Sequence, residues 1–149
     1  MPSRRLPTFD YASAGAYFVT ICAHRRRVLF ASDQLASAVT DCWHEIPSHF
    51  PVEPDGFVVM PNHVHGILWL RAGHARPLRT IVGSFKSATA RRVNELRRTP
   101  GEPVWQRGYY DHVIRDEADL SRIREYIETN PIRWALSGDP LRSESAPAA

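Results

Sequence analysis

The sequence predicts a small α+β domain of the ferredoxin-like type, in which an antiparallel sheet carries helices on one face. Strand-like and helix-like patterns alternate in the order β-α-β-β-α-β, and one more helical pattern follows at the C-terminal end. The chain has 149 residues, of which 43% are hydrophobic, enough for one domain with a core. The second and third strand patterns are almost adjacent, as the two strands of a central hairpin would be.

The first part of the chain begins with a polar arm, residues 1–16, which proline and glycine interrupt. Residues 17–23, with the sequence YFVTICA, are mainly β-branched and aromatic and predict the first strand. Apolar side chains at intervals of three and four then predict a helix over residues 32–46, with Ser32 as its N-cap.

The central part of the chain holds two short strand patterns. A loop with three prolines precedes them. Residues 56–60 predict the second strand and residues 63–70 the third, while Pro61 and Asn62 interrupt them. The stretch FVVMPNHVHGILWL is therefore predicted to be a tight β-turn-β pair.

The remaining elements follow the same alternation. Residues 78–98 predict the second helix, residues 109–114 the fourth strand and residues 117–130 the third helix. Asp116 is the expected N-cap of this last helix. Pro131 is expected to end it, because a proline disfavours helical geometry at the residue before it.

Composition argues against several classes of protein. No apolar run approaches the length of a membrane span, and the basic start lacks the apolar stretch of a signal peptide. With only Cys22 and Cys42, a disulfide framework is not indicated and a reducing cytoplasm is expected. The tail, residues 137–149, is rich in serine, proline and alanine, a composition typical of disorder.

Basic residues are clustered in the middle of the chain. Of 19 basic residues, 18 are arginine and only Lys86 is lysine. From Arg71 to Arg107 there are nine basic residues and two acids. Arginine binds phosphate oxygens in a bidentate manner, so this cluster indicates a phosphate-rich partner. Genomic base composition is an alternative explanation for the ratio of arginine to lysine, but not for the clustering.

Two histidines lie inside an apolar strand, where a core has no need of them. Residues i and i+2 of a strand share a face, so His63 and His65 are expected to project together while Val64 points away. Two imidazoles about 7 Å apart along a strand can hold one divalent metal ion. The alternative is two polar side chains on a solvated face, and a metal site would need a third ligand.

The last helix offers that ligand and a reactive group. Tyr126 and Asn130 are four residues apart and lie at the edge of its apolar stripe. Asn130 can offer a carbonyl oxygen to a metal ion, and Tyr126 can offer a phenol oxygen as a nucleophile. Either residue alone would be ordinary in a helix; together with the histidines they favour a metal-and-tyrosine site.

These segments together resemble the single-tyrosine transposases of the HUH superfamily, most closely the REP-associated tyrosine transposases and their insertion-sequence relatives. The segments that carry the resemblance are YFVTICAHRRRVLF, FVVMPNHVHGILWL, IVGSFKSATARRVN, VWQRGYYDHVIRDEADL and REYIETNPIRW. They span about residues 5–135, nearly the whole chain. The combination of MPNHVH, WQRGYYDHVIR and YIETNP is specific.

The resemblance implies a ferredoxin-like catalytic domain, here residues 17–136, that ends in a catalytic helix. It implies a Mg²⁺ or Mn²⁺ cofactor and the nicking and transfer of single-stranded DNA through a covalent 5′-phosphotyrosine. Matched motif to motif, His63 and His65 are metal ligands and Tyr126 is the nucleophile, while Asn130 takes the polar position one turn later and is expected to be the third ligand. Two histidines favour Mn²⁺ over Mg²⁺, which prefers oxygen ligands.

The expected partner is DNA that contains a hairpin next to a single-stranded segment, in the cytoplasm at the nucleoid. Candidate DNA-binding residues are basic or aromatic: Arg4, Arg5, Arg79, Lys86, Arg91, Arg92, Trp105, Arg107 and Tyr109. Core packing is an alternative role for Trp105. The resemblance leaves open whether the protein is a monomer or a homodimer.

Three alternatives remain open from the sequence. Tyr109 and Tyr110 compete with Tyr126 as nucleophile, although in a strand one of the two must face the core. The domain could instead be a metal-dependent nuclease that uses water. It could also be a catalytically idle DNA-binding domain that the host retains.

Overall fold

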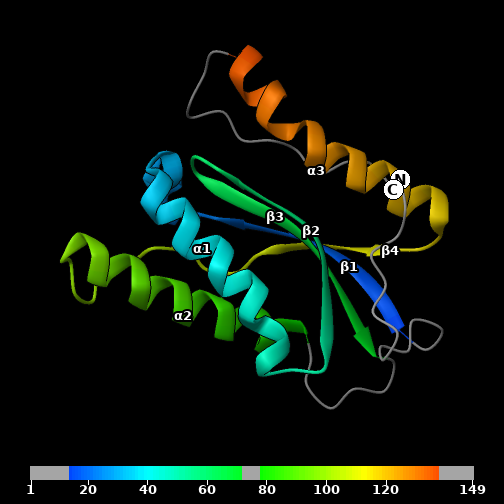
Figure 1. Ribbon diagram of the computed structural model, residues 1–149, viewed down its shortest axis with the longest axis horizontal. Helices are drawn as coiled ribbons and strands as arrows, with labels where there is room; N and C mark the ends of the chain where they lie inside the picture. The colour runs from blue at the N-terminus through cyan, green and yellow to red at the C-terminus, as the bar shows by residue number, and fades with distance from the viewer. Residues whose placement is uncertain (1–13, 72–77, 138–149) are drawn as a thin grey trace.

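The structure is a computed structural model that describes residues 14–71 and 78–137. A four-stranded sheet lies between two layers of helices (Figure 1). The elements in chain order are β1 (Ala14–Cys22), α1 (Asp33–Glu45), β2 (Val52–Met60), β3 (His63–Arg71), α2 (Leu78–Arg97), β4 (Tyr110–Ile114) and α3 (Glu117–Ser137), with 3₁₀ turns at His24–Arg26, Leu29–Ala31 and Ile46–Ser48.

The strand order β2-β3-β1-β4, with every neighbouring pair antiparallel, is that of a ferredoxin-like sheet. The predicted fold class is therefore confirmed. The helix caps expected from the sequence are also present, because Ser32 Oγ accepts from Leu35 N at 3.3 Å and Asp116 Oδ1 accepts from Asp119 N at 2.8 Å.

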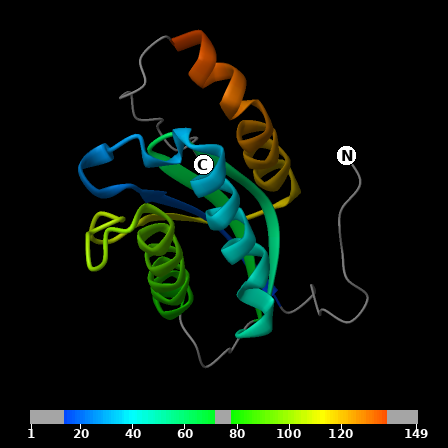
Figure 2. The same cartoon turned by 60° about the vertical axis from the view of Figure 1, so that its left-hand side comes forward.

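The two faces of the sheet have different coverings (Figure 2). α1 and α2 bury one face, where Val19 and Ile21 of β1 pack into the larger apolar cluster. α3 covers the other face, where Phe18 of β1 and Ile67 of β3 join a smaller cluster. Side chains alternate along a strand, so residues two positions away from Phe18 and Ile67 are also directed toward α3.

Two predicted boundaries were wrong at the ends of strands. β1 begins at Ala14, three residues earlier than expected, and β2 begins at Val52, inside the predicted proline loop. β2 is an edge strand, where a proline has no hydrogen bond to lose on its open side. The pairing of β2 with β3 also shifts between Pro54 and Phe57, which accommodates the proline as an irregularity.

The predicted end of the last helix was also wrong. α3 continues through Pro131 to Ser137. A proline inside a helix removes its own N–H and so one backbone hydrogen bond, but the turns on either side can continue. Pro131 is exposed, so its ring does not have to fit between the helix and the sheet.

Two further observations complete the fold. Cys22 and Cys42 are buried and unbridged. None of the helices within residues 14–71 and 78–137 is long and apolar enough to span a bilayer.

Candidate active site

The two histidines of β3 meet on the face of the sheet that α3 covers. His63 and His65 are 2% and 0% exposed, and Val64 between them packs into the cluster on the opposite face. The Nε2 atoms of the two rings are 3.1 Å apart. The predicted common face of the histidines is therefore confirmed, and their ring nitrogens converge more closely than the strand spacing alone suggests.

The other ring nitrogen of each histidine is held by a neighbouring side chain. Nδ1 of His63 is 2.7 Å from Oδ1 of Asn62, and Nδ1 of His65 is 2.8 Å from Oγ1 of Thr20. An amide oxygen only accepts, so the Nδ1–H of His63 donates to Asn62 and its Nε2 keeps a lone pair. If the Nδ1–H of His65 donates to Thr20 in the same way, the Nε2 atoms of both histidines carry lone pairs that are available to a single ligand.

Sequence analysis missed Asn62 and Thr20. Asn62 directly precedes His63, so its proximity could have been inferred from the MPNHVH stretch. Thr20 could not, because it reaches His65 only through the register of β1 with β3.

Burial keeps both imidazoles neutral. It lowers the pKa of His63 to about 4, and the positive charge of Arg26 adds to this effect. Burial likewise lowers the pKa of His65 to about 3, with a further contribution from His63. A neutral imidazole is the form that binds a metal ion.

α3 brings Tyr126 and Asn130 to the same face. The ring of Tyr126 is 6% exposed, and its centroid is 5.4 Å from that of His65 and 6.1 Å from that of Phe18. Asn130 lies one turn further along and is 0% exposed. Within the part of the chain that the structure describes, neither Oδ1 nor Nδ2 of Asn130 has a hydrogen-bond partner. A buried amide without a partner is costly, so a water molecule or a ligand that pairs with Asn130 would stabilise this arrangement.

The residues present fit a divalent metal ion. Adjacent ligands of an octahedral ion at about 2.1 Å are about 3.0 Å apart, close to the 3.1 Å between the two Nε2 atoms. The amide oxygen of Asn130 is a suitable third donor. Within the described residues no group of three or more histidines, cysteines or carboxylates could hold a metal ion, so any third protein ligand beside the two imidazoles would have to be of another type, such as an amide.

The predicted DNA-binding residues are not gathered around this site. Arg79 and Arg91 are exposed on α2, which packs on the opposite face of the sheet. Arg92, on the same helix, pairs with Glu45 at 2.9 Å. Arg107 is exposed in the segment before β4, and Tyr109 is half-buried against the α1 and α2 cluster. Arg4 and Arg5 lie outside the described residues.

Two of these residues make contacts within the protein. The indole of Trp105 is 9% exposed, packs against Phe30 and Phe85, and donates to Thr89 Oγ1 at 2.8 Å. It is a core residue, and its ring faces are occupied. Lys86 is half-buried, and its Nζ donates to the carbonyls of residues 106 and 108 at 2.9 Å each, so it holds the segment before β4.

One basic residue near the histidines was not predicted. Arg26 is half-buried and is the charged side chain whose field reaches His63. Both Arg25 and Arg26 have positive φ, at 53° and 54°, a conformation that is uncommon for residues other than glycine. The AHRRR stretch after β1 could have been noted in the sequence as a basic turn, but its position beside His63 depends on the fold.

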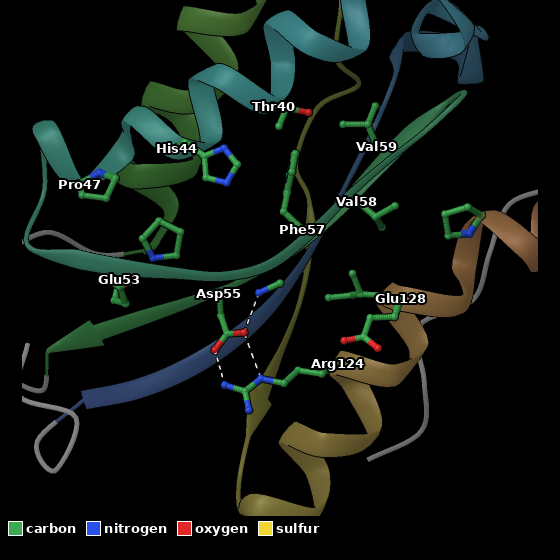
Figure 3. Close-up of a pocket in the computed structure, with 14 residues that line it drawn as sticks. Thr40, His44, Pro47, Glu53, Asp55, Phe57, Val58, Val59, Arg124 and Glu128 are labelled. Atoms are coloured by element: carbon green, nitrogen blue, oxygen red, sulfur yellow. Dashed lines mark hydrogen bonds and ion pairs between the residues drawn. The ribbon is translucent and has the colours of Figure 1, made fainter. Parts of the chain in front are cut away.

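A cleft of about 830 Å³ opens along β2, between α1 and α3 (Figure 3). Asp55 on its wall accepts from Arg124 of α3 at 2.6 and 3.1 Å, which ties the helix to β2. Val58, which also lines the cleft, is in register with His65. None of the four predicted catalytic or metal-binding residues lines the cleft, so it lies next to the histidine pair and does not contain it.

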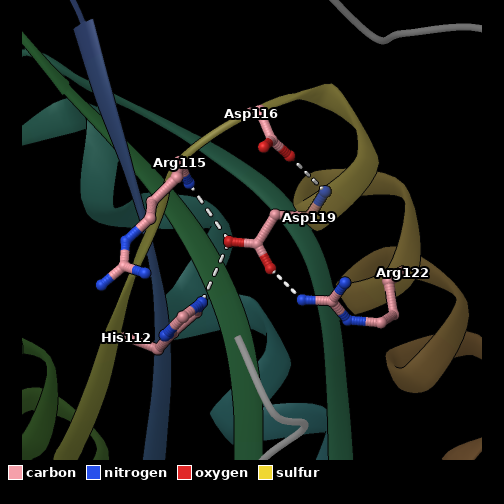
Figure 4. Close-up of polar contacts among 5 residues, drawn as sticks. All are labelled: His112, Arg115, Asp116, Asp119 and Arg122. Carbon is pink, nitrogen blue, oxygen red and sulfur yellow. Dashed lines mark hydrogen bonds and ion pairs between the residues drawn. The ribbon is translucent and has the colours of Figure 1, made fainter.

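A second polar contact fixes the start of α3 to β4 (Figure 4). The buried carboxylate of Asp119 accepts from Nε2 of His112 at 3.0 Å, from the backbone N–H of Arg115 at 3.1 Å, and from Arg122. Burial alone would raise the pKa of Asp119, but these hydrogen bonds and charges lower it below its usual value. α3, and with it Tyr126, is therefore held to the sheet at two points.

Comparison with known proteins identifies the family. Residues 12–130 match the model of a family described as IS200-like transposases. A protein of Haemophilus influenzae with no assigned function is 38% identical, over 89% of this chain and 88% of its own length. The REP-associated tyrosine transposase of Escherichia coli strain K12 is 25% identical, over 83% of this chain and 70% of its own length.

A solved structure shares the fold. It is a REP-associated tyrosine transposase bound to a REP hairpin, with a TM-score of 0.62, 22% identity, and coverage of 89% of this chain and 74% of that chain. Since the family model covers most of the sequence and the relatives align along nearly its full length, this chain belongs to the IS200-like transposases and is related to the REP-associated tyrosine transposases.

Proposed function

We propose that this protein nicks single-stranded DNA and transfers the cut strand through a covalent bond to Tyr126. One observation carries the proposal: the two histidine Nε2 atoms converge at 3.1 Å, and the ring of Tyr126 packs edge-on against His65 with the ring centroids 5.4 Å apart. Membership of a transposase family supports a DNA-processing role.

The proposed step exchanges one ester bond for another. The phenol oxygen of Tyr126 attacks the scissile phosphorus, and the bond from phosphorus to the 3′ oxygen breaks. The phenol loses its proton, and the departing 3′ oxygen gains one. The products are a free 3′-OH and a 5′-phosphotyrosine. A different 3′-OH can reverse the step, which transfers the strand without a nucleotide cofactor.

His63, His65 and Asn130 would hold a divalent metal ion, Mg²⁺ or Mn²⁺. The ion supplies positive charge that polarises the phosphate. Thr20 and Asn62 orient the two imidazoles so that both Nε2 atoms remain ligands. The mixed nitrogen and oxygen donor set favours Mn²⁺.

The proposed substrate is a DNA hairpin flanked by single-stranded DNA. The solved relative bound to a REP hairpin supports this choice. We expect cleavage of hairpin DNA and little cleavage of the same sequence as a perfect duplex, because Tyr126 is itself buried and needs an accessible phosphate. Equal cleavage of both forms would indicate a general nuclease.

The decisive experiment is detection of the covalent adduct. The protein is incubated with Mn²⁺ and an oligonucleotide labelled on the 3′ side of the cleavage site, then denatured. We expect label on the wild-type protein, none on Tyr126→Phe, and none on His63→Ala. The matched control is Tyr17→Phe, since Tyr17 packs on the opposite face of the sheet and should keep the adduct.

The other outcomes separate the alternatives. A water-using nuclease would release free 5′-phosphate at a rate that Tyr126→Phe leaves nearly unchanged. An idle domain would shift the oligonucleotide in a gel and cut nothing. An adduct that maps to Tyr109 or Tyr110 would keep the transposase proposal and replace its nucleophile.

A further inference from the structure

β4 separates two neighbouring tyrosines onto opposite faces of the sheet. Tyr109, just before the strand, packs against the cluster under α1 and α2. Tyr110 is paired in register with Thr20, whose hydroxyl faces the histidines, and is 60% exposed. Aromatic rings exposed to this extent are uncommon, because an aromatic side chain gains free energy by burial.

Thr20 connects Tyr110 to the histidine pair. On its other side Thr20 is in register with His65, and its Oγ1 is 2.8 Å from Nδ1 of that ring. The side chains of His65, Thr20 and Tyr110 therefore project in one row from β3, β1 and β4. With neighbouring strands about 4.8 Å apart, the Cα atom of Tyr110 lies about 10 Å from that of His65.

The surroundings of Tyr110 leave its ring accessible to a ligand. The cluster that α3 forms with the sheet reaches Ile114 of β4 but does not include Tyr110. β4 is the outer strand of the described sheet, so no strand covers the ring from the side. The adjacent acid, Asp111, is in register with Val19 and points to the opposite face. Its carboxylate therefore does not repel an anionic strand next to the Tyr110 ring.

We propose that Tyr110 stacks on an unpaired base of the DNA strand whose phosphate is presented to His63, His65 and Tyr126. The inference rests on the proposed function for the identity of the substrate. Stacking of a base on an aromatic ring is worth about 1–3 kcal/mol, which corresponds to about 5- to 150-fold in affinity, and it tolerates any base. It needs the ring and not the hydroxyl, so phenylalanine should replace Tyr110 and alanine should not.

The test compares two labelled probes by fluorescence anisotropy, without divalent metal so that no cutting occurs. One probe is a short single-stranded oligothymidylate, and the other has the same number of phosphates but abasic sugars. We expect the wild type and Tyr110→Phe to prefer the probe with bases by at least about fivefold. Tyr110→Ala should lose most of this preference while its affinity for the abasic probe is unchanged.

Val113→Ala is the matched control, because Val113 is also exposed on β4 but faces the other side, in register with Tyr17. It should keep the wild-type preference. The inference would be overturned by a Tyr110→Ala variant that retains the preference for bases, or by a wild type that shows no preference. The first result would mean that a different aromatic ring stacks on the bases.

The adduct experiment keeps the two proposals distinguishable. If Tyr126 forms the adduct and Tyr110→Ala retains the preference for bases, the stacking inference alone is wrong. If the protein forms no adduct and binds neither probe, the proposed function is wrong and the stacking inference falls with it.

Discussion

Oγ1 of Thr20 lies 2.8 Å from Nδ1 of His65, across the pairing of β1 with β3. The contact fixes the ring of a fully buried histidine and decides which nitrogen can face a ligand. The partner of the other histidine, Asn62, comes from the turn that precedes β3, so each imidazole is oriented from a different element.

Replacing Thr20 by valine should weaken metal binding. The side chain keeps its shape but loses the hydroxyl, so the Nδ1–H of His65 is left without an acceptor and the other tautomer is no longer disfavoured. Loss of such a supporting contact typically costs about 10–100-fold in metal affinity. Titration calorimetry with Mn²⁺ measures the change, and Thr20→Ser, which restores the hydroxyl, should recover most of the affinity. Equal affinity of Thr20→Val and the wild type would show that the contact does not orient His65.

Acid should destabilise the metal-free protein. The pKa values of His63 and His65 are lowered to about 4 and about 3, whereas an unfolded histidine titrates near pH 6.5. The unfolded state therefore binds more protons, so the stability these groups contribute is fully present above about pH 6.5. It is lost as pH falls from about 6.5 toward the two folded-state pKa values, by up to about 1.4 kcal/mol per pH unit for each histidine, and no further loss follows below those values.

Urea unfolding in EDTA between pH 6.5 and 5 measures this effect, and comparison with a histidine variant separates it from the contribution of Glu53, whose pKa burial raises. In that window the carboxylates of Asp55 and Asp119, whose pKa values are lowered, stay ionised in both states. His65→Gln removes one titrating group and should reduce the slope by about half. A free energy of unfolding that is flat over this range would contradict the burial of two neutral imidazoles.

Asp119→Asn should loosen the start of α3. The amide keeps the size of the side chain but removes the charge that accepts from His112 and Arg122 and presents a donor where an acceptor is needed. Loss of a charged hydrogen bond in a buried position costs about 1–3 kcal/mol. Chemical denaturation measures the loss, and Asp111→Asn, exposed on β4, should change stability by less than about 0.5 kcal/mol.

Gly66→Ala should be strongly destabilising, although it adds one methyl group. A Cβ atom at Gly66 would lie 2.4 Å from the ring of Trp43 and 2.9 Å from that of Phe57, and these two rings are stacked on each other. Overpacking of this kind costs about 1–3 kcal/mol. Gly83→Ala is the control, because Gly83 lies inside α2 with open space around it. That change should stabilise the protein by about 0.5–1 kcal/mol. A smaller loss for Gly66→Ala than about 0.5 kcal/mol would mean that Trp43 moves freely.

The parts of the site that follow from local periodicity could be predicted. Alternation along a strand placed His63 and His65 together, and helical spacing placed Tyr126 and Asn130 on one side of α3. What depends on packing between distant segments could not be predicted. Trp105 looks like a ring for stacking until Phe30 and Phe85 are seen to enclose it. Pro131 looks like a stop signal, because its exposure on the finished helix is not visible in the sequence.

Only two residues, Arg115 and Asp116, separate β4 from α3. So short a connection, fastened at once by Asp119, seats the helix on the sheet of its own chain. We therefore expect the proposed nucleophile, Tyr126, and the proposed metal ligands to act together within one polypeptide. The rate of adduct formation should be first order in protein concentration. A mixture of the Tyr126→Phe and His63→Ala variants should form no adduct, because a site that takes its tyrosine and its histidines from one chain is defective in both variants.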